Sequence, residues 1–131
     1  MKCNTHQKVS KDIMKQRVRP YSCELDAALD VVGGKWKALI LWALSTGTQR
    51  FGDLKRLIPG VTEKMLIQQL RELEHDGIIH REVYAQVPPK VEYSLTDRGV
   101  SLNAALATLG AWGRENMTHI CAVKGVDAPV H

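Results

Sequence analysis

One segment, residues 60–77, constrains the fold of this chain more than any other, because it has the pattern of a single helix with both ends marked. Thr62 is a favourable N-cap residue, and Glu63 adds negative charge in the first turn, where the helix dipole favours it. Gly77 is placed to end the helix in a left-handed backbone conformation. One side carries an apolar stripe at positions i, i+4 and i+7, formed by Leu66, Leu70 and Leu73. The helix is therefore expected to pack on a core through this stripe.

A second stripe, free of acidic residues, lies almost opposite the apolar one and consists of Lys64, Gln68, Arg71 and His75. Glutamine can pair with adenine through two hydrogen bonds, arginine can pair with guanine in the same way, and lysine can meet guanine or a phosphate. A helix that binds in the major groove of DNA needs such side chains. The same pattern is also typical of an ordinary solvated helix face, so the neighbouring segments decide between the two interpretations.

The segments before this helix predict three shorter helices, over residues 23–32, 35–44 and 51–57. The pair Gly33-Gly34 separates the first two, and Ile58-Pro59-Gly60 connects the third to the helix with the two stripes. A short helix, a tight turn with glycine and a longer helix form the helix-turn-helix pattern, in which the second helix is placed to read DNA. The residues expected to face the core are Leu25, Leu29 and Val32 in the first helix, Trp36, Leu39, Ile40 and Ala43 in the second, and Phe51, Leu54 and Leu57 in the third.

A β-hairpin is predicted directly after Gly77, because the apolar period changes there from that of a helix to that of a strand. Residues 78–84 and 91–95 are the expected strands, and residues 85–90, with two prolines, are the loop. A hairpin in this place is the wing of a winged helix. Arg81 and Lys90 are expected near its exposed side, either in contact with phosphates or the minor groove or simply solvated.

The two ends of the chain are expected to lie outside the DNA-reading unit. Residues 1–20 form a basic arm, which is either a frayed tail or a segment that contacts phosphates or a dimer partner. A helix over residues 97–119 carries more apolar surface than a small domain buries, which predicts a homodimer; the alternative is that it folds back on its own core. The winged domain with this dimerisation helix spans residues 21–120, and residues 121–131 are expected to be a flexible tail. The apolar stripe of the last helix contains Leu102, Leu106, Leu109, Met117 and Ile120, with Trp112 on its flank.

The composition supports one globular domain and permits a polyanionic partner. The chain has 131 residues, a net charge of +4 and a pI of about 9.1. No apolar run is long enough to span a bilayer and no secretory signal is present, so a cytoplasmic protein is expected.

Cys3, Cys23 and Cys121 form neither a disulfide framework nor a paired zinc motif, so no metal or cofactor is expected. No pairing of a nucleophile with a base and no phosphate-binding glycine loop is found, so the chain is not expected to be an enzyme.

Several segments occur in one order along the chain: Gly33-Gly34-Lys35-Trp36, residues 50–54, 61–66, 70–77 and 88–96. Together with Cys23 near a helix start, they resemble the HxlR-type winged helix-turn-helix regulators of bacteria over about residues 22–113. The resemblance implies a homodimeric transcription factor whose N-terminal and C-terminal helices build the dimer. Its two recognition helices are then expected to enter successive major grooves.

Cys23 is the candidate redox-sensing residue. In several members of the family the corresponding cysteine senses oxidants or electrophiles, and a helix N-terminus favours the reactive thiolate. The family commonly has proline directly after this cysteine, whereas Glu24 follows here, and a neighbouring carboxylate disfavours a thiolate. Either Cys121 or Cys3 could serve as the partner in a disulfide between subunits.

We therefore predict a mainly α-helical winged helix-turn-helix fold with a small β-hairpin, and a dimer built from the N- and C-terminal helices. The predicted function is that of a sequence-specific DNA-binding transcriptional regulator, a repressor by the habit of the family, with double-stranded DNA and a second copy as partners. The residues expected to contact DNA are Thr62, Lys64, Gln68, Gln69, Arg71, Arg81 and Lys90. Two alternatives stay open. One is control by a small ligand in a dimer groove lined by Trp36, Trp42 and Trp112; the other is a protein-interaction module without specific DNA binding.

Overall fold

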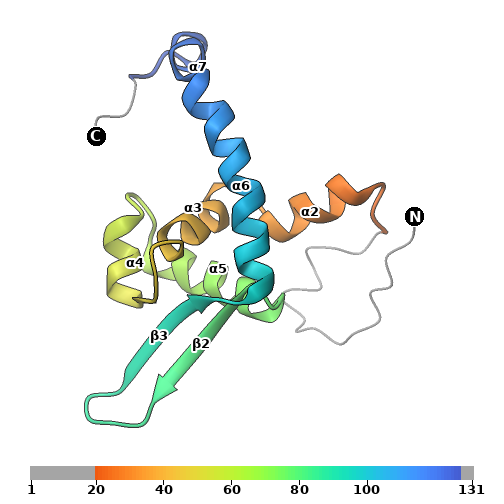
Figure 1. The fold of residues 1–131 in the computed structure, drawn as a ribbon. Helices are drawn as coiled ribbons and strands as arrows, with labels where there is room; N and C mark the ends of the chain where they lie inside the picture. The colour runs from red at the N-terminus through yellow and green to blue at the C-terminus, as the bar shows by residue number, and fades with distance from the viewer. Residues whose placement is uncertain (1–19, 128–131) are drawn as a thin grey trace.

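The computed structural model of the chain describes residues 20–127 and is mainly helical, with one small antiparallel sheet (Figure 1). Its elements are α2 (Glu24–Val32), α3 (Lys35–Leu44), β1 (Gln49–Arg50), α4 (Phe51–Leu57), α5 (Glu63–His75), β2 (Ile79–Tyr84), β3 (Lys90–Leu95), α6 (Asp97–Glu115) and α7 (Met117–Lys124). This order confirms the predicted winged helix-turn-helix. Residues 1–19 of the basic arm lie outside the described residues, and so do residues 128–131.

The core lies where α3, α4 and α5 meet, and it explains why these three helices form. The largest fully buried side chains are Ile40, Leu41, Leu54, Ile58, Leu66 and Leu73. The predicted stripe of Leu66, Leu70 and Leu73 is buried, so α5 packs on the core as expected. Burial of this apolar surface is the main force that holds the three helices together.

The sheet has the strand order β1-β3-β2, and all its pairs are antiparallel. Ile79 lies opposite Leu95 at the base of the hairpin, and Tyr84 lies opposite Lys90 toward its tip. β1 joins only the base, where Gln49 lies opposite Tyr93. The outer part of the hairpin therefore extends beyond the helices as a two-stranded ribbon (Figure 1).

One joint holds the end of α5, the hairpin and the start of α6 together. The Thr96 hydroxyl oxygen accepts a hydrogen bond from the Gly99 amide at 3.0 Å and thereby caps α6. The same hydroxyl lies 2.7 Å from the Gly77 carbonyl oxygen and 2.9 Å from the Ile78 carbonyl oxygen. A Cβ atom on Gly99 would lie 2.1 Å from the Ile78 carbonyl oxygen, so only glycine fits where α6 crosses the chain after α5.

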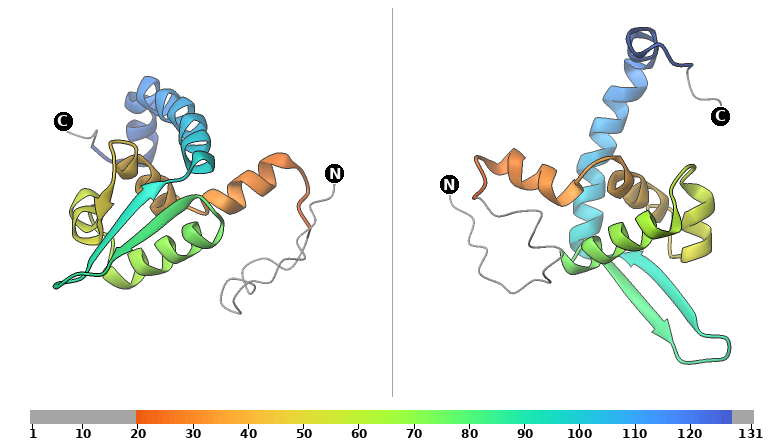
Figure 2. Two further views of the ribbon diagram at one scale, coloured as in Figure 1. Left: turned by 60° about the horizontal axis from the view of Figure 1, so that its bottom comes forward. Right: turned by 180° about the vertical axis from the view of Figure 1, so that it is seen from behind.

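The first helix differs from the prediction. α2 buries no residue, and Leu25 and Leu29, which were expected to face the core, are 65% and 60% exposed. Val32 is half-buried. The physical reason is that α2 projects from the body of the molecule, as Figures 1 and 2 show, so none of the other described elements covers Leu25 and Leu29. Leu39 of α3 and Leu57 of α4 are also exposed rather than buried.

The expected single helix over residues 97–119 is two helices. Asn116 ends α6, and its side-chain amide donates to the Trp112 carbonyl oxygen at 2.9 Å; such local bonds compete with helix continuation. α7 then runs to Lys124, so the predicted tail boundary at residue 121 falls inside a helix. Leu102 and Leu106 pack against the core, but Leu109 is 64% exposed because α6 leaves the body beyond this point. No helix among residues 20–127 is long and apolar enough to cross a membrane.

Candidate nucleic-acid interface

The two ends of α5 are formed as the sequence predicts. The Thr62 hydroxyl oxygen accepts a hydrogen bond from the Met65 amide at 3.1 Å, which confirms Thr62 as the N-cap. At the other end Gly77 has a φ of +75°, and the Ile78 amide donates to the Leu73 carbonyl oxygen at 2.9 Å. This left-handed glycine stops the helix and directs the chain into β2.

The exposed face of α5 differs from the predicted polar stripe, because it lies closer to the hairpin. Its exposed residues after Glu63 are Lys64, Met65, Ile67, Arg71, Glu74 and His75, whereas Gln68 and Gln69 are half-buried. Lys64 and Arg71 therefore stand on the surface as expected. Ile67 and Glu74 were not expected there, although Ile67 is an apolar residue outside the Leu66, Leu70 and Leu73 stripe and so carried a signal.

The side chains of Gln68 and Gln69 contact neighbours on the same helix. The Gln68 side-chain amide donates to Glu72 Oε2 at 2.6 Å. The Gln69 amide nitrogen lies 3.4 Å from Met65 Sδ, and Gln69 Oε1 is buried without a hydrogen-bond partner among the described residues. Both side chains thus border the exposed face rather than form its centre.

A buried ion pair explains why the exposed face of α5 lies closer to the hairpin than predicted. Lys37 Nζ of α3 lies 2.5 Å from Glu72 Oε1 of α5, and the two side chains are 5% and 6% exposed. Glu72 was expected at the side of the helix, and the sequence pattern gives no sign of its partner. Because α3 covers this side of α5, the face left open is the one toward the hairpin. Asp76 at the end of α5 is half-buried; burial raises the pKa of its carboxyl group, and attraction to Lys37 opposes that shift.

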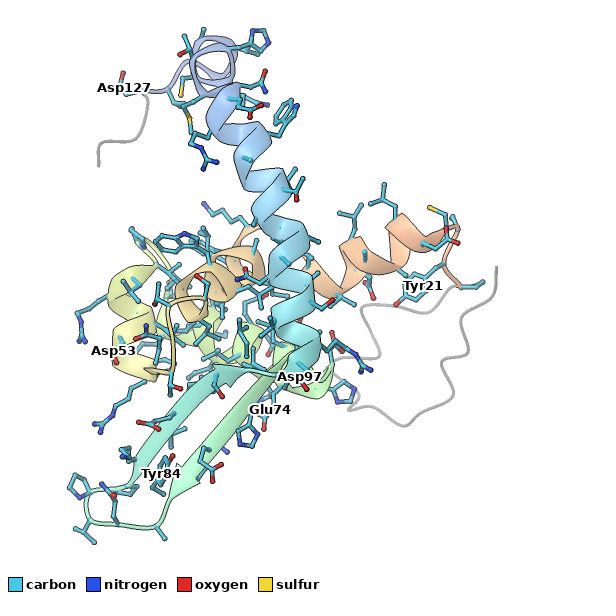
Figure 3. The ribbon with its side chains drawn as sticks, in the orientation of Figure 1. Tyr21, Asp53, Glu74, Tyr84, Asp97 and Asp127 are labelled. Atoms are coloured by element: carbon cyan, nitrogen blue, oxygen red, sulfur yellow. The ribbon has the colours of Figure 1, made fainter. Side chains whose placement is uncertain are left out.

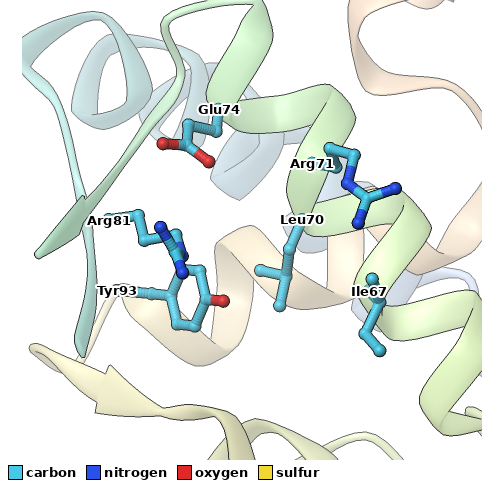
Figure 4. A pocket seen from close by; sticks show the side chains of 6 residues that line it. All are labelled: Ile67, Leu70, Arg71, Glu74, Arg81 and Tyr93. Carbon is cyan, nitrogen blue, oxygen red and sulfur yellow. The ribbon is translucent and has the colours of Figure 1, made fainter. Parts of the chain in front are cut away.

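A cleft of about 300 Å³ separates the exposed face of α5 from the hairpin. It is lined by Ile67, Leu70, Arg71, Glu74, Arg81 and Tyr93 (Figure 4). Arg71 approaches it from α5 and Arg81 from β2 (Figure 4), while Glu74 lies beside the base of the hairpin (Figure 3). The cleft thus brings together two of the sequence-predicted arginines from separate elements.

Arg81 and Lys90 point to opposite faces of the hairpin. Successive side chains of a strand alternate between faces, and Arg81 pairs with Tyr93 whereas Tyr84 pairs with Lys90. Lys90 Nζ lies 4.4 Å from the centre of the Tyr84 ring and 3.9 Å from Glu92 Oε2. A hydrogen bond to Glu92 raises the pKa of the Tyr84 hydroxyl. Arg81 is therefore exposed toward the cleft, and the half-buried Lys90 is engaged within the hairpin, contrary to the expectation that both lie near its exposed side.

The two cysteines within residues 20–127 are free thiols. Cys23 is the exposed N-cap residue of α2, with an extended backbone and no side-chain cap hydrogen bond. Cys121 is half-buried in α7. Cys3 lies outside the described residues. In the part of the chain that the structure covers, no three His, Cys, Asp or Glu residues are grouped to hold a metal ion.

Comparisons with known proteins agree with this architecture. The model of a family described as HxlR-like helix-turn-helix matches residues 31–121. The HTH-type transcriptional regulator YtcD of Bacillus subtilis is 52% identical over 102 residues, which cover 78% of this chain and 81% of YtcD. YtfH of Escherichia coli, another HTH-type transcriptional regulator, is 46% identical over 102 residues, with the same coverage.

Two solved structures of one regulator are also similar. The redox regulator HypR in its reduced form has a TM-score of 0.73 and 46% identity, covering 76% of this chain and 99% of that chain. Its oxidised form has a TM-score of 0.69 and 50% identity, covering 72% and 97%.

Proposed function

The chain belongs to the HxlR-like helix-turn-helix family of transcriptional regulators, and from this premise we propose that it binds a specific DNA site as a homodimer and represses transcription. An inverted-repeat operator matches such a dimer, because two-fold symmetry in the protein pairs with two-fold symmetry in the site. A repressor acts by occupying the site and excluding the transcription machinery.

The arrangement of α5 beside the hairpin is the observation that carries the proposal. Exposed cations lie on two elements: Arg71 of α5 and Arg81 of β2 line one cleft, and Lys64 lies two helical turns before Arg71 on α5. If α5 enters a major groove, the hairpin lies over the adjacent minor groove, and the cleft receives the phosphate strand between them. Arg71 is placed for bidentate contact with guanine, and Lys64 and Arg81 for guanine or phosphates. Thr62, Gln68 and Gln69 extend this surface at its borders, whereas Lys90 lies on the other face of the hairpin.

Exposed apolar side chains on the other elements support the homodimer. Within residues 20–127 they include Leu25 and Leu29 of α2, Leu109 and Trp112 of α6, and Val123 of α7. α6 and α7 rise on the side away from the hairpin, and α2 projects from the body (Figures 1 and 2). Apolar surface on this scale is typical of an interface, and a second copy that covers these helices leaves both α5 helices free for DNA.

A thiol signal through Cys23 is the proposed control. Cys23 is exposed at the N-terminus of α2, one of the helices assigned to the dimer, and the similar regulator HypR has solved reduced and oxidised forms. Oxidation or alkylation of Cys23 would place a new group where α2 meets the second copy. Control by a small ligand is the alternative; it is favoured by the exposure of Trp42 and Trp112, which leaves both indole rings available to line a dimer groove.

The test is fluorescence anisotropy with the duplex upstream of the protein's own gene and a scrambled duplex, at one salt concentration. Native protein, Cys23→Ser and Cys121→Ser are measured reduced and after a mild thiol oxidant. The proposal expects specific binding by all three reduced proteins, and an oxidant effect that Cys23→Ser abolishes. Specific binding unaffected by oxidant removes the thiol switch and keeps the regulator. Equal binding of both duplexes, followed by failure to select any sequence from random DNA, contradicts specific binding and leaves the protein-interaction module.

A further inference from the structure

Ile67 is an apolar side chain on the exposed face of α5, between Lys64 and Arg71. It is 44% exposed and lies one helical turn from Lys64 on one side and from Arg71 on the other. Single exposed hydrophobic residues are ordinary on protein surfaces. Ile67 differs from these because it lies between two exposed cations, on the surface where a polyanion is expected.

No other part of the described chain covers Ile67. It borders the cleft between α5 and the hairpin, with the buried Leu70 and the ring of Tyr93 among its neighbours in the lining (Figure 4). The apolar surfaces assigned to a second copy lie on α2, α6 and α7; α6 rises from the base of the hairpin, so its far end and α7 lie away from the hairpin (Figure 1). The lining has two arginines, Arg71 and Arg81, against one acidic residue, Glu74, so its net positive charge fits DNA as the occupant.

An apolar side chain in the major groove has one specific target. The C5-methyl group of thymine is the apolar feature that distinguishes its base pair in this groove, and apolar side chains contact it. Ile67 lies in the N-terminal half of α5, the part of a recognition helix that reaches base edges. A β-branched side chain in a helix has one strongly preferred χ1 rotamer, so its methyl groups are held in place before DNA binds.

We propose that Ile67 is a specificity-determining residue that recognises the methyl group of one thymine in each operator half-site. This inference rests on the proposed DNA-binding function and deepens it. It assigns to α5 an apolar contact in addition to the hydrogen bonds of Arg71 and Lys64.

The experiment replaces thymine by uracil, which removes the methyl group and keeps the hydrogen-bonding groups. A high-affinity duplex is first selected from random DNA with the native protein. Each thymine is then replaced singly by deoxyuridine, and affinity is measured by fluorescence anisotropy at one salt concentration. The native protein should lose affinity by about fourfold at one thymine per half-site, as expected for one buried methyl group.

Variants of Ile67 connect this loss to the side chain. Ile67→Ala should bind the thymine and uracil duplexes equally at that position, and Ile67→Val should keep the preference for thymine. Met65→Ala is the matched control, since Met65 is an exposed apolar residue of the same helix (39%) that does not line the cleft; it should keep the native preference. Circular dichroism of each variant checks that the fold is retained.

Three results would overturn the inference and leave the DNA-binding function in place. These are a selected site without a preferred thymine, a native protein indifferent to every uracil replacement, or an Ile67→Ala protein that discriminates as the native one does. A selection that yields no specific site contradicts the proposed function itself, and the inference with it.

Discussion

At the residue scale, the Asp76 carboxylate at the end of α5 lowers the stability of the folded state. It is the C-cap residue of α5, where the negative end of the helix dipole disfavours a carboxylate. Burial raises the pKa of its carboxyl group above the ordinary value of 3.8, and the attraction to Lys37 only partly offsets this. The folded state therefore holds the proton more tightly than the unfolded state, and stability falls as pH rises from 3.8 through the folded-state pKa.

Asp76→Asn should remove this cost. We expect the free energy of unfolding to rise by about 0.5 kcal/mol at pH 7, with the gain over native protein shrinking as pH falls toward 4. Urea unfolding at pH 7, 5 and 4 measures the difference. Glu74→Gln, which removes an exposed carboxylate from the same helix end, shows how much of the gain comes from the dipole alone. A variant less stable than native protein at pH 7 would contradict this explanation.

At the element scale, the Lys37–Glu72 pair fixes how α5 sits against α3. Both side chains are almost fully buried, and Gln68 binds the second oxygen of Glu72. Removal of one partner of a buried ion pair leaves an uncompensated charge, which costs far more than removal of both.

Lys37→Met should therefore lower the free energy of unfolding by about 3 kcal/mol, and Lys37→Met with Glu72→Leu should recover most of this loss. Urea unfolding of the three proteins tests this, and equal losses in the single and double variants would count against it.

The joint between α5, the hairpin and α6 gives a second prediction at this scale. Gly99→Ala should lower the free energy of unfolding by about 3 kcal/mol, because the added methyl group would collide with the Ile78 carbonyl and force the backbone apart. Gly110→Ala in the same helix is the control: nothing among the described residues lies within 4 Å of its added Cβ, so a gain of about 0.5–1 kcal/mol is expected. Thermal unfolding of both variants gives the comparison. A Gly99→Ala protein as stable as Gly110→Ala would show that the crossing is not tightly packed.

The sequence predicted the elements well because their signals are local. The helices over residues 35–44 and 51–57, the Thr62 cap and the Gly77 stop all depend on residues within a few positions of one another. The exposed face of α5 depends on Lys37, which lies 35 residues before its partner Glu72. Periodicity shows which side of a helix is apolar, but it does not show which other side a distant element covers. For this reason Lys64 and Arg71 are exposed as predicted, whereas Gln68 of the same predicted stripe is half-buried.

At the scale of the whole molecule, periodicity likewise does not show what covers α2, α6 and α7, the helices that project from the core. α2 was expected to bury Leu25 and Leu29, because an apolar stripe predicts a buried face without saying which molecule buries it. α2, α6 and α7 carry exposed apolar side chains, and α5 with the hairpin carries the exposed cations Lys64, Arg71 and Arg81. We propose that the first three helices hold two copies together and that α5 with the hairpin binds DNA.

A single titration can test whether a dimer of this chain reads DNA through α5. The selected duplex and a scrambled duplex are each titrated with native protein, Arg71→Ala and Arg114→Ala at one salt concentration, and the stoichiometry is measured. Arg114→Ala is the matched control, because Arg114 is an exposed arginine near the far end of α6. We expect two chains per selected duplex. Arg71→Ala should weaken binding to the selected duplex by about 5- to 150-fold and binding to the scrambled duplex much less, and Arg114→Ala should bind like the native protein. An Arg71→Ala protein that binds the selected duplex with native affinity would contradict the assignment of α5 as the DNA-reading helix.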